Sequence, residues 1–500
     1  MYFIGIDIGT TNCKLCLFRM PSGELVSKHS FPTPKILQQE QSNFDVDLLW
    51  EGVLEGLTAL AGSVDYGENI VSIAVASVGE AGVLLDGSDR PVGPAMTWYD
   101  IRTQPQLEKL LTQFDEQELY RITGIPPHSN YSLNKISWII EHHGLPDSRV
   151  SWLCIAEYIA FRLCGVKRAE ASLASRTLAL DIRSASWSET ILQKSKLPGD
   201  IFSPVVASGT EIGQLLPSVV SRTGLSGKVG IAVAGHDHMC GSVAAGVKDG
   251  SQILNSTGTT EGLLILLEQP ELSEEFYRAR LSNGLHVVPG RHTLYASLPS
   301  AGYCIEWFRK LFNVSAGAFN GLMAELDSEL NDVAEFRKSM GGFIPHLRGS
   351  GPPNRSILSR AMFYGINENT DKKAILKFIF LGLCFELKNL LDTCETLTDR
   401  HFKQVKVIGS ACKNPFWLRL KATVLNREVI ACDIDEAVSK GAAMIAARMK
   451  GLQPAGNRDE THYLPVEELV SDCLDHFRQV YLPFYHEKIQ IERQANKESV

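Results

Sequence analysis

Residues 2–18, YFIGIDIGTTNCKLCLF, contain the pattern that decides the fold. The apolar run Tyr2–Ile8 predicts a β-strand, the small polar residues Gly9–Asn12 predict a tight turn, and Lys14–Phe18 predicts a second strand. A similar pattern recurs about half a chain later, where residues 257–265 read TGTTEGLLI. That separation is far longer than the ~20–50 residues of a solenoid repeat. It favours two related domains that each begin with a β-hairpin.

Strands and helices alternate through the rest of the sequence. Apolar residues recur at helical spacing over residues 48–60, after Asp45 and Asp47, which are typical helix N-cap residues. Further predicted elements are strands at 70–76, 405–408 and 429–432 and helices at 377–394 and 437–449. The alternation indicates an α/β fold with layered sheets. A boundary near Gly246 divides the chain into domains 1–246 and 247–500.

Composition limits the class of protein. The 500 residues are 44% hydrophobic and 21% charged, and 49 basic against 57 acidic side chains give a net charge of −8. This balance disfavours a basic nucleic-acid surface and a polybasic membrane tail. No apolar run approaches the ~18 residues of a membrane span, and no secretion signal is recognisable. We expect a cytoplasmic protein with no nucleic-acid or membrane partner.

The cysteines do not suggest disulfides or zinc. There are eleven, an odd number, and they are scattered through apolar stretches. Cys13 and Cys16 form a C-x-x-C pattern, but residues three apart on a strand point to opposite faces. We therefore predict reduced thiols that pack as small apolar side chains.

The two G-T-T turns are the first candidates for chemistry. Such a turn presents backbone N–H groups and two hydroxyls, which can hold phosphate oxygens without a lysine. The only Gly-Lys pair, Gly227-Lys228, precedes Val229, so the usual lysine-containing phosphate loop is absent. Hairpin turns of this composition are also common without any function, and the residues alone leave that alternative open.

Asp237 is the second candidate. It follows the apolar run Val229–Val233, and ligands of open α/β sheets bind just beyond strand ends. A carboxylate there can accept the proton of a substrate hydroxyl. A metal site with His236 and His238 and a turn without function are the alternatives.

A series of motifs resembles the FGGY carbohydrate kinases, which phosphorylate sugars and polyols with MgATP. The resemblance runs from residue 4 to about residue 450 and keeps the order of the family's motifs. It is carried by Gly5–Asn12, Trp98–Thr103, Gly235–Asp237, Ser256–Thr259, Ser300–Trp307, Gly409–Trp417 and Lys440–Ala443. The resemblance implies two ribonuclease H-like domains of the actin/hexokinase type, flanking a deep catalytic cleft.

The same resemblance implies roles for individual residues. Asp237 would be the general base, and Asp7 would belong to the Mg²⁺ site. ATP would be bound by Thr10, Thr11, Asn12, Gly258, Thr259, Gly302, Gly409, Ser410 and Asn414. The carbohydrate would be bound by Glu80, Trp98, Asp237 and His238.

Departures from the family pattern leave the substrate open. Gly79-Glu80 stands where glycerol kinases usually have Arg-Glu and xylulokinases Met-His. Ser410 replaces a usual glycine, so adenine must tolerate its hydroxymethyl group or gain a hydrogen bond. We expect an ATP- and Mg²⁺-dependent kinase of a ketose or polyol, with homodimer formation left open. The alternative is a nucleotide-gated, actin-like or chaperone-like ATPase on the same fold.

Overall fold

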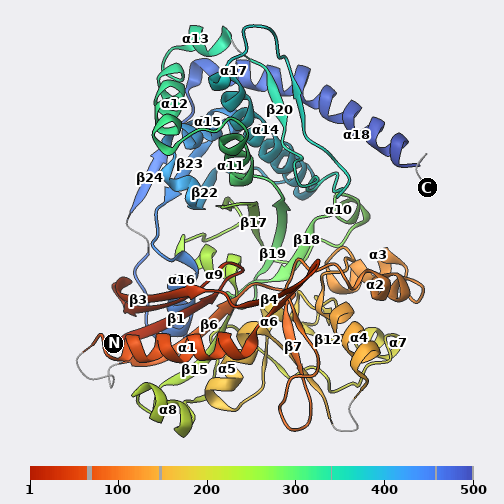
Figure 1. The fold of residues 1–500 in the computed structure, drawn as a ribbon, viewed down its shortest axis with the longest axis vertical. Coiled ribbons are helices and arrows are strands. Elements are labelled where there is room, and N and C mark those ends of the chain that lie inside the picture. The colour runs from red at the N-terminus through yellow and green to blue at the C-terminus, as the bar shows by residue number, and fades with distance from the viewer. Residues whose placement is uncertain (65–69, 146–148, 339, 457–458, 498–500) are drawn as a thin grey trace.

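Two large β-sheets, one from each half of the chain, form the framework of the protein (Figure 1). The computed structural model describes residues 1–64, 70–145, 149–338, 340–456 and 459–497. Sheet 1 has the strand order β14-β15-β6-β1-β2-β3, and sheet 2 the order β18-β19-β17-β16-β22-β23-β24. Within these described ranges, no helix has the length and apolarity needed to cross a membrane.

Sheet 1 is centred on the predicted N-terminal hairpin. β1 (Tyr2–Ile8) pairs antiparallel with β2 (Asn12–Arg19), and Ile8 lies opposite Cys13. β1 also pairs parallel with β6 (Ile70–Ser77), which pairs parallel with β15 (Gly230–His236). The remaining strands are β3 (Glu24–Pro32) and β14 (Glu211–Gln214). The carboxyl ends of β1, β6 and β15 therefore meet at one edge.

Sheet 2 repeats this arrangement. β16 (Gln252–Thr257) and β17 (Glu261–Leu267) form an antiparallel hairpin, and β16 pairs parallel with β22 (Gln404–Gly409). The other strands are β18 (Ser282–Leu285), β19 (His292–Leu298), β23 (Glu428–Cys432) and β24 (Glu460–Tyr463). The two hairpins predicted from the repeated G-T-T pattern are confirmed.

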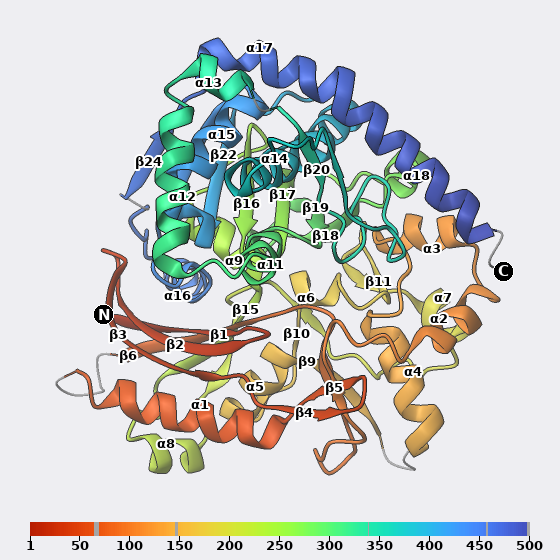
Figure 2. The same ribbon diagram turned by 45° about the horizontal axis from the view of Figure 1, so that its top comes forward.

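Helices complete a layered α/β arrangement (Figures 1 and 2). α1 (Val46–Ala61) and α5 (Ile155–Cys164) pack on one face of sheet 1, and α9 (Asp237–Ala244) and α16 (Ala437–Met449) on the other. α9 and α16 share their core with one face of sheet 2, and the opposite face is covered by α14 (Lys372–Thr398) and α15 (Pro415–Leu425). Two helices therefore lie between the sheets.

The side chains of β2 show how one strand serves two layers. Cys13 belongs to the core under α1 and α5, whereas Cys16 belongs to the core shared with α9 and α16. Both thiols are free and buried, and burial raises the pKa of each to about 12. The prediction of packed strand cysteines on opposite faces is confirmed.

α16 approaches its neighbours through glycines. A Cβ atom added at Gly5 of β1 would lie 1.8 Å from the Ser439 carbonyl oxygen. A Cβ atom added at Gly441 would lie 1.9 Å from the carbonyl oxygen of Cys240 in α9. These contacts require glycine because no side chain fits between the backbones. α16 comes from the second half of the chain but is fixed against β1 and α9 of the first.

Short elements between β6 and β14 form a lobe beside sheet 1, with a core that includes Leu84, Ile136 and Trp152. They are β7 (Gly82–Leu85), β8 (Ala95–Met96), α2 (Gln104–Leu111), α3 (Glu116–Thr123), α4 (Ser132–His143), β9 (Ser151–Cys154), β10 (Ala169–Glu170), α6 (Ala171–Ala174), β11 (Leu180–Asp181), β12 (Ser186–Trp187), α7 (Glu189–Lys194) and β13 (Val205–Val206).

The remaining elements extend both halves. In the first half they are β4 (Lys35–Gln38), β5 (Gln41–Phe44) and α8 (Pro217–Thr223). In the second half they are α10 (Glu274–Arg278), α11 (Gly302–Leu311), α12 (Ala316–Glu329), α13 (Val333–Lys338), β20 (Gly342–Ile344), β21 (Met362–Tyr364), η2 (Ser410–Lys413), α17 (Glu467–His476), η3 (Phe477–Tyr481) and α18 (Leu482–Lys497).

Candidate active site

The turn between β1 and β2 exposes the first group of predicted phosphate contacts. The backbone N–H of Gly9 donates to the carbonyl of Asn12 at 3.2 Å, and the Thr33 hydroxyl donates to the carbonyl of Gly9 at 2.7 Å. Thr11 and Asn12 are exposed. The Thr10 hydroxyl instead accepts a hydrogen bond from Trp98 Nε1 at 2.8 Å. Two predicted site residues are therefore bonded to each other, and the Trp98 N–H is occupied in this arrangement.

The turn between β16 and β17 carries the second group. Thr259 is exposed, and its carbonyl accepts a hydrogen bond from the Ala301 N–H at 3.1 Å. Gly302, the first residue of α11, donates its N–H to the carbonyl of Gly258 at 3.0 Å. A Cβ atom at Gly302 would lie 2.6 Å from that same oxygen. The start of α11 can rest on this turn because residue 302 is glycine.

A buried ion pair supports the second turn from behind. Lys421 on α15 lies 2.5 Å from the Glu261 carboxylate at the start of β17, and neither side chain is accessible beyond 1%. The same ammonium group donates to Asn255 Oδ1 at 2.6 Å and to the Thr257 hydroxyl at 3.3 Å. A fully hydrogen-bonded buried charge fixes geometry strongly. The ends of both hairpin strands are thereby attached to α15.

The predicted nucleoside residues gather at the neighbouring strand end. Gly409 lies opposite Thr257 across the β16–β22 ladder and has φ +95°, and a Cβ atom there would lie 2.4 Å from the Thr257 carbonyl oxygen. The Ser410 hydroxyl donates to that same carbonyl at 3.3 Å. Asn414 caps α15 by accepting from the Trp417 N–H at 3.0 Å. The hydroxyl of Ser410 is thus bonded within the protein.

Asp237 and Asp7 lie at the carboxyl edge of sheet 1. Asp237 is the first residue of α9, directly after β15, as predicted, and 19% of its side chain is exposed. Burial raises its pKa, but the charges of His238 and His236 and the N–H of His238 outweigh it and lower the pKa to about 2. Burial and the charge of Asp237 raise the pKa of Asp7 to about 7. Asp237 is therefore ionised at neutral pH.

The Asp7 carboxylate fits a magnesium ion that arrives with the nucleotide. Mg²⁺ is usually held by one or two carboxylates together with substrate phosphates and water. Burial is the main cause of the raised pKa of Asp7, and the charge of Asp237 adds to it, whereas the charge of Lys14 lowers it. A cation bound at Asp7 would favour the ionised carboxylate in the same way as Lys14 does. Among the described residues, no group of three or more His, Cys, Asp and Glu side chains could hold a metal on its own.

Glu80 is buried, has a strained backbone conformation and is influenced by the charge of His236, the residue before Asp237. Its φ is +63°, which non-glycine residues rarely adopt, and the buried Lys135 ammonium donates to its carbonyl at 2.7 Å. Arg176 donates to the Glu80 carboxylate from Nε and Nη2, both at 2.7 Å. Burial opposes ionisation, but the charges of Arg176 and His236 lower the pKa of Glu80. Glu80 is therefore a buried, paired carboxylate.

Arg176 is a site residue that the sequence reasoning missed. A Cβ atom added at Gly79 would lie 2.9 Å from His236 Cδ2 and 3.3 Å from Arg176 Cγ. The space beside Gly79 is thus filled by the His236 ring and the aliphatic part of Arg176. The Arg176 guanidinium bonds Glu80, so this site keeps an Arg–Glu pair although residue 79 is glycine. Arg176 follows the four-residue helix α6, which has too few residues for a periodic pattern.

Aromatic rings and histidines surround this pair. The guanidinium carbon of Arg176 lies 5.4 Å from the centre of the Tyr131 ring and 6.0 Å from that of Tyr295 on β19. The His238 and Tyr295 ring centres are 5.2 Å apart. A Cβ atom added at Gly262, next to the second phosphate turn, would lie 3.3 Å from His238 Cε1. His238 therefore joins the surroundings of Asp237 to sheet 2.

A buried hydrogen-bond chain lies behind Asp237. The Ser172 hydroxyl donates to the Glu170 carboxylate at 2.7 Å and accepts from the His236 N–H at 2.9 Å. Glu170 also accepts from the Ser208 hydroxyl. Gly235 has φ +116°, and a Cβ atom there would lie 2.4 Å from Ser172 Oγ. The residues just before Asp237 are therefore fixed by α6.

Solved structures with the same fold are carbohydrate kinases by title. The chain matches a gluconate kinase from Lactobacillus acidophilus with a TM-score of 0.86 at 19% identity, covering 97% of this chain and 98% of that one. It matches a xylulose kinase from Rhodospirillum rubrum with a TM-score of 0.86 at 19% identity, covering 98% and 100%. These matches confirm the two-domain fold of the actin/hexokinase type.

Sequence comparisons give the family. The chain is 27% identical over 455 residues to a xylulose kinase from Lactococcus lactis, covering 90% of this chain and 88% of the relative. It is 25% identical over 467 residues to a glycerol kinase from Saccharolobus islandicus, covering 90% and 88%. Residues 2–244 match the N-terminal domain, and residues 253–449 the C-terminal domain, of one family of kinases. The chain belongs to the FGGY family of carbohydrate kinases.

Proposed function

We propose that the protein transfers the γ-phosphoryl group of ATP to a hydroxyl of a small ketose or polyol, with Asp237 as the general base. The observation that carries this proposal is the ionised, partly exposed carboxylate at the start of α9, next to His236 and His238. A positioned carboxylate can take the hydroxyl proton as that oxygen attacks phosphorus. The family membership favours this reaction over the assembly ATPase considered from the sequence.

The two G-T-T turns supply the triphosphate contacts in this proposal. Thr11, Asn12 and Thr259 are exposed, and Gly258 offers open space where a Cβ atom would stand. Asp7 would hold the magnesium ion, which, when bound, neutralises charge on the transferring phosphoryl group. Gly302, Gly409, Ser410 and Asn414 would border the nucleoside.

On the acceptor side, Glu80 and Arg176 would bind carbohydrate hydroxyls together with His238 and Trp98. A paired carboxylate and guanidinium offer both acceptors and donors in a fixed arrangement. A site built to bond a hydroxyl rejects an analogue that lacks it. Xylulose, glycerol and gluconate, named in the titles of similar proteins, are the first compounds to screen by ADP release.

The test of the general base is Asp237→Asn. Asparagine is nearly isosteric but accepts a proton poorly, so kcat should fall about 10²–10⁴-fold while ATP affinity changes little. Single-turnover phosphoryl transfer and thermal unfolding are measured on the same variant. A stable variant that transfers phosphate within about threefold of wild type would contradict the role, because a base contributes far more.

A further inference from the structure

Tyr295 brings a side chain of sheet 2 to the acceptor side of the candidate active site. It lies on β19, where Leu294, Ala296 and Leu298 belong to the core covered by α14 and α15. Successive residues of a strand point to opposite faces, so Tyr295 points the other way and packs against the core that contains α9 and α16. The second half of the chain thereby adds a ring to a site whose other acceptor residues come from the first half.

The Tyr295 ring contacts three groups around Asp237. Its centre lies 6.0 Å from the guanidinium carbon of Arg176, 6.4 Å from the centre of the His236 ring and 5.2 Å from that of the His238 ring. These are contact distances for a guanidinium over an aromatic ring and for neighbouring rings. The ring therefore touches both histidines that flank Asp237 in the sequence.

The members of this cluster differ in exposure. Those nearly closed to solvent, each at most 7% exposed, are Glu80, Tyr131, Arg176 and His236. Asp237, His238 and Tyr295 keep intermediate exposure. A ligand that reaches the Asp237 carboxylate can therefore contact the His238 and Tyr295 rings without rearrangement of the buried groups.

Gly262 leaves the space that the Tyr295 ring occupies. In the β17–β19 ladder, Gly262 lies opposite Ser297 and Leu264 lies opposite Tyr295, so residues 262 and 295 share one face of the sheet. A Cβ atom added at Gly262 would lie 3.3 Å from Tyr295 Oη, 3.4 Å from its Cε2 and 3.3 Å from His238 Cε1. The place where these two rings meet can take a ring from residue 295 or from residue 262, but not from both.

Residues 345–361, which connect β20 to β21, pack closely on β19. A Cβ atom added at Gly351 would lie 2.7 Å from the carbonyl oxygen of Ser297 on this strand. Ser350, directly before Gly351, donates its N–H to the Ser356 carbonyl at 2.8 Å, and its hydroxyl accepts from the Ser356 N–H at 2.9 Å. These bonds close the connection into a turn, so its close approach to β19 is fixed.

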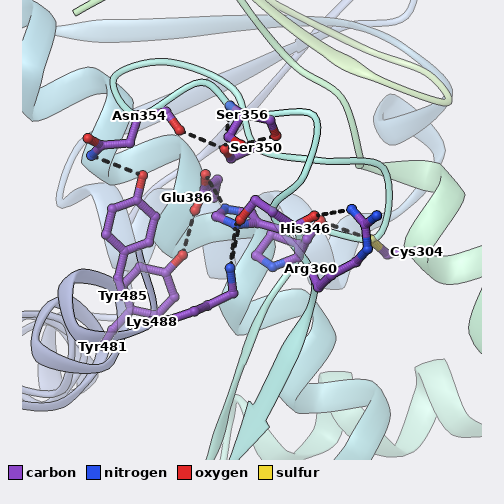
Figure 3. A network of polar contacts seen from close by, with 12 residues as sticks. Cys304, His346, Ser350, Asn354, Ser356, Arg360, Glu386, Tyr481, Tyr485 and Lys488 are labelled. Carbon is purple, nitrogen blue, oxygen red and sulfur yellow. Dashed lines mark hydrogen bonds and ion pairs between the residues drawn. The ribbon is translucent and has the colours of Figure 1, made fainter. Parts of the chain in front are cut away.

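A buried polar network ties this connection to two helices (Figure 3). His346 lies 2.8 Å from the Ser359 hydroxyl through Nδ1 and 3.1 Å from Glu386 on α14 through Nε2. Lys488 on α18 donates to the Ser359 hydroxyl at 2.7 Å, and the Tyr481 hydroxyl donates to Glu386 at 2.6 Å. Buried polar networks in which every member is bonded favour one arrangement of the chain. The connection that packs on β19 is therefore attached to α14 and α18.

We propose that Tyr295 is a substrate-binding residue that sets carbohydrate specificity, and that its ring contacts C–H groups of the carbohydrate whose hydroxyl Asp237 deprotonates. The proposal rests on the proposed function, because it requires the carbohydrate to bind beside Asp237. Ligand sites combine aromatic surfaces with a few polar groups that fix orientation. Asp237 and His238 supply polar groups here, and Tyr295 supplies the accessible aromatic surface. Carbohydrate affinity then depends on sheet 2, although the general base belongs to the first half of the chain.

The first test measures ADP release from Tyr295→Ala and Tyr295→Phe with a panel of small carbohydrates that includes xylulose, glycerol and gluconate. Loss of the ring should raise the KM of the preferred carbohydrate about 10- to 100-fold and leave the ATP KM within about twofold of wild type, because the ring lies on the acceptor side. Tyr295→Phe keeps the ring, so its carbohydrate KM should stay within about threefold of wild type. The matched control is Tyr463→Ala, which removes a partly exposed ring from β24, the strand of sheet 2 farthest from β19, and should change neither KM.

The second test moves the ring from residue 295 to residue 262. Gly262→Phe alone places a second ring against Tyr295 and His238, so it should impair carbohydrate turnover. In the double variant Tyr295→Ala/Gly262→Phe, the added ring has the vacated space. Its carbohydrate KM should therefore be at least about threefold lower than that of Tyr295→Ala, a coupling expected only for residues that share one place.

Thermal unfolding of each variant separates binding from folding. If Tyr295→Ala folds poorly, Tyr295→Leu keeps an apolar side chain without a ring and gives the same comparison. A stable variant without the ring but with an unchanged carbohydrate KM, or with an equal rise in the ATP KM, would overturn the proposal. A double variant no better than Tyr295→Ala would also count against it. A wild-type protein inactive on the whole panel would instead contradict the proposed function, whereas an active one with an unchanged KM in Tyr295→Ala contradicts this inference alone.

Discussion

The buried carboxylate of Glu80 depends on one guanidinium. Arg176→Met should lower the free energy of unfolding by about 3–5 kcal/mol, because it leaves an unpaired charge in a buried site. The partner change Glu80→Gln in the Arg176→Met background removes that charge, so most of the lost stability should return. Urea unfolding of the single and double variants measures both effects.

The double variant of this pair distinguishes a role in stability from a role in binding the carbohydrate. If the Arg176→Met/Glu80→Gln variant regains stability but not carbohydrate turnover, the pair serves the substrate. A double variant as unstable as Arg176→Met would mean that the lost packing of the arginine, not the unpaired charge, causes the loss. An exposed control is Arg90→Met, which removes an i,i+4 ion pair with Asp86 and should change the free energy of unfolding far less than Arg176→Met does.

Residue patterns predicted some of this site and could not predict the rest. Asp237 was predicted because an apolar strand precedes it, and the structure places it at the start of α9. Its base role stays a prediction. Arg176 and Tyr295 gave no comparable pattern, because long-range packing alone brings them to Glu80 and His238. Local periodicity carries no information about such contacts.

At the scale of elements, the contact between α16 and α9 has no room for a side chain. Gly441→Ala places a Cβ atom 1.9 Å from the Cys240 carbonyl oxygen, so the two helices must move apart. We expect a loss of about 1–3 kcal/mol in the free energy of unfolding, as for other overpacked cores. Because Asp237 begins α9, kcat should fall as well. Thermal unfolding and ADP release measure the two effects.

The control for this prediction is Gly321→Ala. Gly321 lies in the exposed helix α12, and a Cβ atom there would meet nothing within 4 Å. Alanine is the better helix former by roughly 1 kcal/mol, so this variant should be slightly stabilised. Equal destabilisation of both variants would show that the close approach of α16 and α9 is not the cause.

The elements that the sequence predicted are those with long, regular patterns. The strand at 2–8 and the helix at 437–449 have the observed bounds, and the helix predicted at 48–60 begins after the Asp45 cap. The helix predicted at 377–394 is longer, Lys372–Thr398, because it begins directly after the Asp371 cap and continues to Asp399. The two- to four-residue strands of the lobe between β6 and β14 were not predicted, because such segments are too short for periodicity.

At the scale of the whole molecule, a neutral histidine links sheet 2 to α9. His286 follows β18 and is 4% exposed. Its Nε2 lies 2.9 Å from the Ser242 hydroxyl on α9, and its Nδ1 accepts from the Val288 N–H at 3.1 Å. Because Nδ1 is an acceptor, protonation there breaks the bond to Val288. Burial lowers the pKa of His286 from its ordinary 6.5 to about 3.

This lowered pKa predicts sensitivity to acid with a definite sign. Between about pH 6.5 and pH 3, the unfolded chain binds a proton at His286 and the folded protein does not, so lowering the pH favours unfolding. The contribution of His286 to stability is complete above pH 6.5, and its loss approaches about 1.4 kcal/mol per pH unit within this window.

His286→Gln keeps a polar side chain that does not titrate. Denaturant unfolding between pH 6.5 and pH 4.5 measures the free energy of unfolding of both proteins. As the pH is lowered, that free energy should fall less steeply in His286→Gln than in wild type, and the two slopes should differ by up to the value for one bound proton. The control for removing an imidazole is His462→Gln. His462 is half-exposed, lies on the edge strand β24 of sheet 2 and is paired with Glu428 on β23. Identical pH slopes for wild type and His286→Gln would show that His286 is protonated in the folded protein, and the link between sheet 2 and α9 would then not depend on a neutral imidazole.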